Sequence, residues 1–180
     1  CSRLVDVACE GGVPDIVLIA HGTLPVQLEC QTDLSTLESA LTVNGTSVCL
    51  LAEAFASRMQ DDVERSIVIL GSVAGDRGRK SNYAYGAAKG LVTRFAQGLQ
   101  HRLALEKSSL CVTLVKPGPT ATAMTAQLPQ DKLAKPEDVA EQITTAVKRR
   151  SRVVYAPTKW ALIMFVISNL PAFIFNKMDI

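Results

Sequence analysis

The chain has 180 residues, of which 48% are hydrophobic and 20% are charged, and its formal net charge is +2. This composition is ordinary for one globular domain with a single buried core. A net charge this close to zero argues against an electrostatic nucleic-acid surface, so we expect no nucleic acid among its partners. The five cysteines are scattered without a Cys-x-x-Cys pair, which predicts neither disulfides nor a metal site and indicates a reducing, cytoplasmic compartment.

The first half of the chain alternates between predicted strands and predicted helices. Asp15–Ala20 is a nearly continuous apolar run, which predicts a strand buried on both faces of a parallel sheet. A long helix is expected from about Asp33 to Met59, with Asn44 near its middle. Ser66–Leu70 predicts the next strand, and Asn82–Leu105 predicts a second long helix.

The second half continues the alternation. Leu110–Val115 predicts a buried strand, and a loop of small and turn-forming residues follows it. Pro136 and the two acidic residues after it open a helix, because proline suits the first turn and acids favour the positive end. Val153–Tyr155 predicts a short last strand. The pattern predicts an α/β fold, the second half of a Rossmann-like doubly wound parallel sheet, with residues 1–157 in the domain and residues 158–180 as an apolar segment packed on it.

Three polar residues near the second strand and the second helix indicate carbonyl chemistry. Tyr85 and Lys89 are four residues apart, so on a helix the ammonium lies beside the phenol, and such a charge lowers the pKa of a phenol. Tyr85 is then suited to protonate a carbonyl oxygen that Ser72, at the end of the preceding strand, also binds. A Tyr-x-x-x-Lys pair alone also fits an ordinary exposed helix. The strand, the serine and the glycine-rich loop before it favour the catalytic interpretation.

Two segments resemble those of a known superfamily. Gly71–Gly90 (GSVAGDRGRKSNYAYGAAKG) and Lys116–Thr122 (KPGPTAT) are similar to the active-site and cofactor segments of the short-chain dehydrogenase/reductase superfamily, and the resemblance covers nearly all of the chain from Asp15 onward. It implies an enzyme with the catalytic residues Asn44, Ser72, Tyr85 and Lys89. It also implies that NAD or NADP, between which the sequence does not choose, contacts Ala20, Gly22, Tyr85, Lys89, Pro117, Gly118, Thr120 and Thr122.

The resemblance implies a role for each catalytic residue. Tyr85 protonates the substrate oxygen as hydride arrives from the nicotinamide, and Ser72 holds that oxygen. Lys89 lowers the pKa of the phenol and holds the nicotinamide ribose. Asn44 kinks its helix and holds a water that links Lys89 to solvent. Thr122 and the loop before it hold the carboxamide.

The chain departs from the family in two places. The family opens with a strand, a Thr-Gly-x-x-x-Gly-x-Gly turn that admits the cofactor pyrophosphate, and a helix, whereas Gly71–Gly78 has the wrong final spacing to serve as that turn. We therefore expect the chain to be a fragment that lacks roughly 60–70 residues of a ~250-residue domain and is inactive alone. His21 replaces the middle residue of the family's Asn-Ala-Gly triplet, and a structural hydrogen bond is its expected role.

The apolar tail supports a narrower likeness. The stretch SVAGDRGRKSNYAYGAAKG and the tail from Val153 onward are similar to reductases that act on decaprenylphosphoryl-2-keto-ribose. The segment from Trp160 to Phe175 is interrupted by Pro171 and is shorter than the roughly 20 residues that a membrane span requires. Two interpretations stay open: the tail covers the core or a partner subunit, or it is an apolar flap that meets a membrane surface or a polyprenyl chain.

Three functions follow from these observations. The leading one is NAD(P)-dependent reduction of a keto group to an alcohol on a polyprenyl-phosphate-linked sugar, at the cytoplasmic surface of a membrane. The second keeps the reaction but assigns a small hydrophobic ketone as substrate. The third is a non-catalytic Rossmann-like module. The expected partners are the nicotinamide cofactor, the carbonyl or alcohol substrate, a membrane surface touched peripherally, and further copies of the chain in a homo-oligomer.

Overall fold

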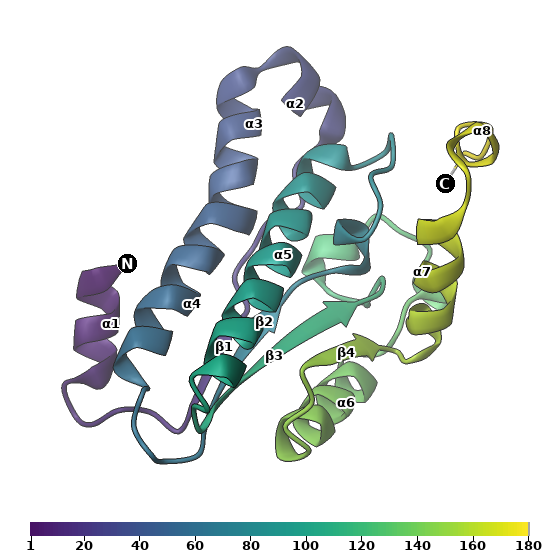
Figure 1. Cartoon of the computed structure of the whole chain (residues 1–180). Coiled ribbons are helices and arrows are strands. Elements are labelled where there is room, and N and C mark those ends of the chain that lie inside the picture. Colours follow the sequence, from purple (N-terminus) through teal and green to yellow (C-terminus); the bar gives the residue numbers. More distant parts are fainter. Residues whose placement is uncertain (180) are drawn as a thin grey trace.

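The computed structural model describes residues 1–179 and contains one parallel sheet of four strands in the order β1-β2-β3-β4 (Figure 1). The strands are β1 (Ile16–Ile19), β2 (Arg65–Leu70), β3 (Leu110–Pro117) and β4 (Val153–Ala156). In the register of the sheet, Ile19 lies opposite Ile69 and Leu70 lies opposite Val115. The predicted α/β fold with a Rossmann-like parallel sheet is confirmed.

The helices connect the strands in the predicted order. They are α1 (Ser2–Cys9), α2 (Gln27–Thr32), α3 (Leu34–Leu41), α4 (Ser47–Arg58), α5 (Tyr83–Leu105), α6 (Pro136–Lys148), α7 (Lys159–Asn169) and α8 (Ala172–Phe175). Helices α4 and α5 pack against each other and cover the sheet from one side, with the main core between them and the strands (Figure 1). Helix α6 packs against β3 and β4. The sequence pattern did not predict α1 and α2.

Strand β1 is covered on one face only, which corrects the expectation that it is buried on both. Val17 and Ile19 belong to the core, whereas Ile16 and Leu18 are each 58% exposed. Helix α4 packs against β1 from the side of the core, and no other helix among residues 1–179 covers the opposite face of this strand. A continuous apolar run is compatible with both arrangements, so periodicity alone could not separate them.

The long helix expected around Asn44 is present but interrupted. Asp33 caps α3, because its carboxylate accepts a hydrogen bond from the Ser35 backbone. A π-helical turn at Thr42–Thr46 then separates α3 from α4. By length and composition this 25-residue stretch, Leu34–Arg58, could cross a membrane, but its side chains also build the core through α4.

The tail forms α7 and α8, with Pro171 at the break between them. Met164 is the only buried residue of α7, while Leu162 and Phe165 are about 70% exposed. Helix α7 has 11 residues, fewer than the roughly 20 that a membrane span requires. Covering the core therefore accounts for Met164 but not for most of the apolar surface of this helix.

Candidate active site

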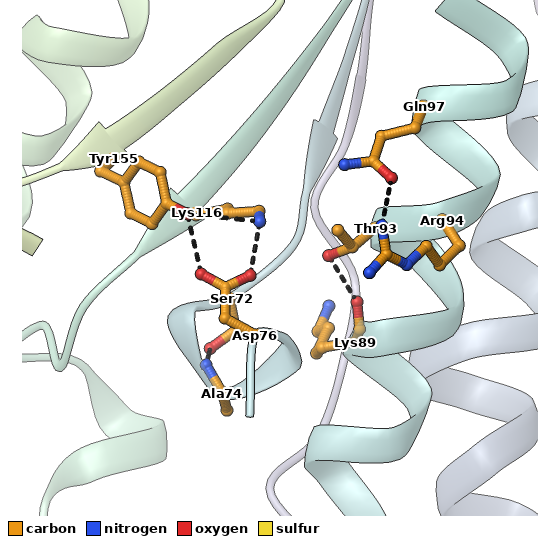
Figure 2. A network of polar contacts seen from close by, with 9 residues as sticks. All are labelled: Ser72, Ala74, Asp76, Lys89, Thr93, Arg94, Gln97, Lys116 and Tyr155. Carbon is orange, nitrogen blue, oxygen red and sulfur yellow. Dashed lines mark hydrogen bonds and ion pairs between the residues drawn. The ribbon is translucent and has the colours of Figure 1, made fainter. Parts of the chain in front are cut away.

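Ser72 is held at the carboxyl end of β2 by a loop that lies directly against α5. Its Oγ accepts a hydrogen bond of 3.1 Å from the Ala74 backbone and so caps a short 3-10 turn (Figure 2). A Cβ on Gly75 would lie 2.6 Å from the backbone carbonyl of Lys89. A Cβ on Gly86 would lie 2.9 Å from the carbonyl of Ala74. Glycine at both positions therefore permits the contact that brings Ser72 to the helix.

Tyr85 and Lys89 lie one turn apart on α5, as predicted, and both contribute to the wall of one pocket. The Lys89 side chain is nearly inaccessible, and its Nζ donates a hydrogen bond of 2.8 Å to the carbonyl of Leu70. The same Nζ lies 5.7 Å from the centroid of the Tyr85 ring. Burial lowers the pKa of Lys89 to about 8, because the ammonium has lost most of its water.

The net pKa of Tyr85 in this structure is raised, whereas the spacing of Tyr85 and Lys89 predicted that it would be lowered. Burial raises the pKa of the Tyr85 phenol above its ordinary value, and a hydrogen bond with Ser72 opposes that shift in part. The phenolate would be poorly solvated in the pocket, and the Lys89 ammonium points to the carbonyl of Leu70 instead of the phenol oxygen. Tyr85 therefore holds its proton at neutral pH, which suits a proton donor.

Asn44 lies behind the pocket, in the π-helical turn that interrupts the long helix. It is fully buried; its Nδ2 donates to the Ala40 carbonyl at 2.9 Å, and its Oδ1 accepts from the Thr23 backbone at 2.8 Å. A Cβ on Gly22 would lie 2.9 Å from Asn44 Oδ1 and 3.9 Å from Lys89 Nζ. A π-helical turn lies where the kink at Asn44 is expected, and the kink itself and the water link to Lys89 stay predictions.

The loop after β3 forms the opposite wall. Gly118 donates a backbone hydrogen bond of 2.9 Å to Ala156, and its carbonyl accepts one of 3.0 Å from the Thr120 hydroxyl. A Cβ on Gly118 would lie 1.9 Å from Nε1 of Trp160, so the indole rests directly on this glycine. The tail thus contacts the segment that the sequence assigns to the cofactor. Thr122 also lines the pocket, and it caps the following 3-10 turn.

One cavity of about 430 Å³ brings together all but one of the predicted site residues. Those that line it are Ala20, Gly22, Ser72, Tyr85, Lys89, Pro117, Gly118, Thr120 and Thr122. Asn44 does not reach the wall and contributes from behind, beside Gly22. His21 also lines the cavity, and its Nε2 lies 2.8 Å from Ser47 Oγ, which agrees with a structural hydrogen bond.

The described residues fit the nicotinamide end of a dinucleotide. The Lys89 ammonium has three protons, and Leu70 accepts one of them, so further donors are available for ribose hydroxyls. The absent side chain of Gly22 leaves space beside Asn44 that a Cβ would fill. Among the lining residues, all of them in the described part of the chain, lysine and arginine occur but aspartate and glutamate do not, which suits an anionic cofactor.

Several lining residues were not expected from the sequence. Arg79 and Asn82 come from the loop between Ser72 and Tyr85, and apolar side chains from three further segments complete the wall: Leu24, Met124, Leu128, Val139 and Ile143. A second cation so close to the Tyr-Lys pair is a signal that could have identified Arg79. The apolar residues carry no comparable signal, because they reach the pocket only through the path of the loops.

The family model for short chain dehydrogenases matches residues 12–133. The chain belongs to the short-chain dehydrogenase family. Members of this family are NAD(P)-dependent oxidoreductases, so the predicted enzyme class and cofactor are confirmed at the level of the family. An uncharacterized oxidoreductase of Mycobacterium tuberculosis is 31% identical over 178 residues, which are 97% of this chain and 70% of the relative.

More distant relatives agree with this assignment. A vibriobactin-specific 2,3-dihydro-2,3-dihydroxybenzoate dehydrogenase of Vibrio cholerae is 28% identical over 151 residues, 72% of this chain and 57% of that enzyme. A short-chain dehydrogenase of Burkholderia cenocepacia in complex with NADP superposes with a TM-score of 0.75 at 18% identity, over 86% of this chain and 65% of that one. One from Sphingobium yanoikuyae in complex with NADPH has a TM-score of 0.75 at 22% identity, over 95% of this chain and 72% of that one. The matched part of this chain thus spans 57% to 72% of the length of these proteins.

Proposed function

We propose that the protein reduces a keto group to an alcohol with NADH or NADPH, and that Asn44, Ser72, Tyr85 and Lys89 carry out this reaction. The observation that carries the proposal is that Ser72 and Tyr85 line the wall of one cavity, with the buried ammonium of Lys89 on the same wall. These groups converge on one place where a carbonyl oxygen can accept two hydrogen bonds.

Each residue has a distinct task at this oxygen. The reduced nicotinamide supplies the hydride when it is bound. Ser72 Oγ donates to the carbonyl oxygen and orients it. Tyr85, whose raised pKa keeps the phenol protonated, transfers its proton to the oxygen as negative charge develops there. Lys89 stabilises the phenolate that remains, and Asn44 holds the backbone of Thr23 near the Lys89 side chain.

We infer that the substrate is a keto-sugar linked to a polyprenyl phosphate. The support is the apolar surface of α7 and α8, where Leu162, Phe165 and Phe173 are each about 70% exposed, and the contact of Trp160 in α7 with Gly118. Exposed aromatic and aliphatic side chains gathered on one segment are typical of a surface that meets lipid. The same surface would bring the protein to a membrane peripherally.

A small hydrophobic ketone is the second candidate. The cavity itself favours it, because Leu24, Leu128 and Ile143 line the space next to Ser72 and Tyr85. An apolar wall of this kind holds a compact substrate by burial, at about 25 cal/mol per Å². This candidate needs no contribution from α7 and α8, and that difference makes the two substrates distinguishable.

A double variant of the tail separates the candidates. Leu162→Asp with Phe165→Asp, in the protein produced from its complete gene, should raise KM for a lipid-linked keto-sugar and leave kcat for a soluble ketone unchanged. Both side chains are exposed, so folding should tolerate the change. Val63→Asp, an equally polar change at an exposed valine on the amino side of β2, is the control. Equal turnover of the lipid-linked substrate by variant and native protein would support the small ketone.

A further inference from the structure

Arg79 is a cation of the pocket wall that the proposed reaction does not use. It lines the cavity together with Ser72 and Tyr85, and its Nε is buried without a hydrogen-bond partner. Within residues 1–179, no carboxylate forms an ion pair with Arg79 and no acceptor receives a hydrogen bond from its guanidinium. Arg79 as a whole is half-buried, and the buried part of a cationic side chain is costly to leave without a partner.

The two neighbouring cations of the same loop differ from Arg79 in this respect. Arg77 donates hydrogen bonds to carbonyls at the end of α7, and Lys80 forms an ion pair of 2.8 Å with Asp179. The loop therefore directs Arg77 to the end of α7, Lys80 to the exposed Asp179 and Arg79 to the cavity. Burial lowers the pKa of Arg79 from its ordinary value, and a guanidinium remains charged at neutral pH under such conditions.

The charges around the cavity identify the kind of partner that Arg79 needs. Its lining residues within the described chain include no aspartate or glutamate, so the protein itself provides no counter-charge there. Asn82, next to Arg79 on the same wall, adds an amide that can donate hydrogen bonds. A planar guanidinium with an adjacent amide donor suits the oxygens of a phosphate or a carboxylate.

We propose that Arg79 binds an anionic group of the substrate, a phosphate or a carboxylate, while the keto group of the same molecule lies at Ser72 and Tyr85. This inference rests on the proposed reduction at that site. It assigns the anion to the substrate because Arg79 lies on the segment between the two catalytic residues, whereas the cofactor loop belongs to β3 on the opposite wall. The segment also leads to Arg77, which contacts the tail.

The test compares two keto compounds that differ only in a phosphate group, each with native protein, Arg79→Gln and Arg79→Lys, all produced from the complete gene. Arg79→Gln should raise KM for the phosphorylated ketone about 10- to 100-fold, the range expected for losing a charged hydrogen bond, and should change kcat little. KM for the neutral ketone should stay the same. Arg79→Lys should recover part of the affinity, because it keeps the charge but not the planar fork. Lys80→Gln is the matched control and should change neither substrate.

Two further measurements decide between the sources of the anion. Cofactor affinity, measured by quenching of protein fluorescence, should be equal in native protein and Arg79→Gln; a loss there, with both ketones affected alike, would assign Arg79 to a cofactor phosphate and overturn the proposal. Ketones that carry a sugar phosphate and ketones that carry a lipid-linked phosphodiester are measured separately. A higher KM of Arg79→Gln for either kind, with no change for the neutral ketone, supports the proposal. If native protein reduces no ketone at all, the proposed function is refuted. Calorimetry then still measures the affinity for the phosphorylated ketone, and equal affinity in native protein and Arg79→Gln would refute the role of Arg79.

Discussion

The hydroxyl of Tyr155 donates a hydrogen bond of 2.8 Å to Asp76 Oδ2, across 79 positions of the chain (Figure 2). Lys116 forms an ion pair of 2.5 Å with the other oxygen of the same carboxylate. The side chains of Asp76 and Lys116 are less than 10% exposed, so the pair is buried. Since Asp76 follows Ser72 by four residues, this cluster ties the loop of Ser72 to β3 and β4.

Removing the charge of Asp76 should destabilise the protein strongly. Asp76→Asn leaves the Lys116 ammonium buried without a counter-charge, which costs about 3–5 kcal/mol of unfolding free energy in comparable pairs. The double variant Asp76→Asn with Lys116→Met should recover most of the lost unfolding free energy, because no buried charge remains. Tyr155→Phe removes one hydrogen bond and should cost about 1 kcal/mol. Denaturant unfolding measures all three variants, and an Asp76→Asn cost no larger than that of Tyr155→Phe would contradict a charge-dependent cluster.

Tyr85→Phe tests the proton donor. The variant should lose on the order of 10²–10⁴-fold in kcat while cofactor affinity stays nearly intact, because only the hydroxyl is removed. Tyr83→Phe is the matched control, since Tyr83 lies on the same helix but is exposed and outside the cavity. Steady-state kinetics of both variants give the answer. Near-native turnover by Tyr85→Phe would refute the assignment.

The buried Lys89 predicts a pH-dependent contribution to stability. Its pKa of about 8 in the folded state lies below its ordinary value of 10.5, so between these pH values the unfolded chain binds more protons. The free energy of unfolding should therefore rise with pH across this interval. At pH 7 both states are protonated, and the folded state carries the full cost of burying the charge.

Lys89→Met removes that cost. The variant should be more stable than native protein at pH 7, by on the order of 3 kcal/mol, and this advantage should shrink as pH approaches 10.5. It should also lose turnover, because the charge beside Tyr85 is gone. Urea unfolding at pH 7 and pH 10 measures the difference, with Lys80→Met, an exposed lysine, as control. A stability difference that is the same at both pH values would show that the Lys89 charge is not responsible.

Arg77 should hold the tail in place. Its guanidinium donates to the carbonyls of Ile167 and Leu170 at 2.7 and 2.6 Å, and it lies 3.9 Å from the centroid of the Phe175 ring. Arg77→Ala should release α8 and the end of α7, so limited proteolysis should cleave after α7 several times faster than in native protein. Arg94→Ala, a change at an exposed arginine of α5, should leave the cleavage rate unaltered. Unchanged cleavage in Arg77→Ala would mean that other contacts hold the tail.

Local pattern was sufficient to place Ser72, Tyr85 and Lys89. The four-residue spacing on a helix and the apolar run before Ser72 depend only on neighbours in sequence, and the structure brings all three to one cavity. The pKa of Tyr85 was not predictable in this way. Its direction depends on how much water the fold removes from the phenol, which outweighs the nearby charge.

The sequence by itself determined the parallel α/β architecture, the order of its elements and the residues suited to carbonyl reduction, because apolar periodicity and helix spacing are local properties. Only the tertiary structure decided what the charged residues after Ser72 do. Asp76, Arg77 and Arg79 stand within four positions of one loop, yet they reach the buried Lys116, the end of α7 and the cavity respectively. Their directions follow from how the loop packs between α5, the sheet and the tail, and these segments meet only when the chain is folded.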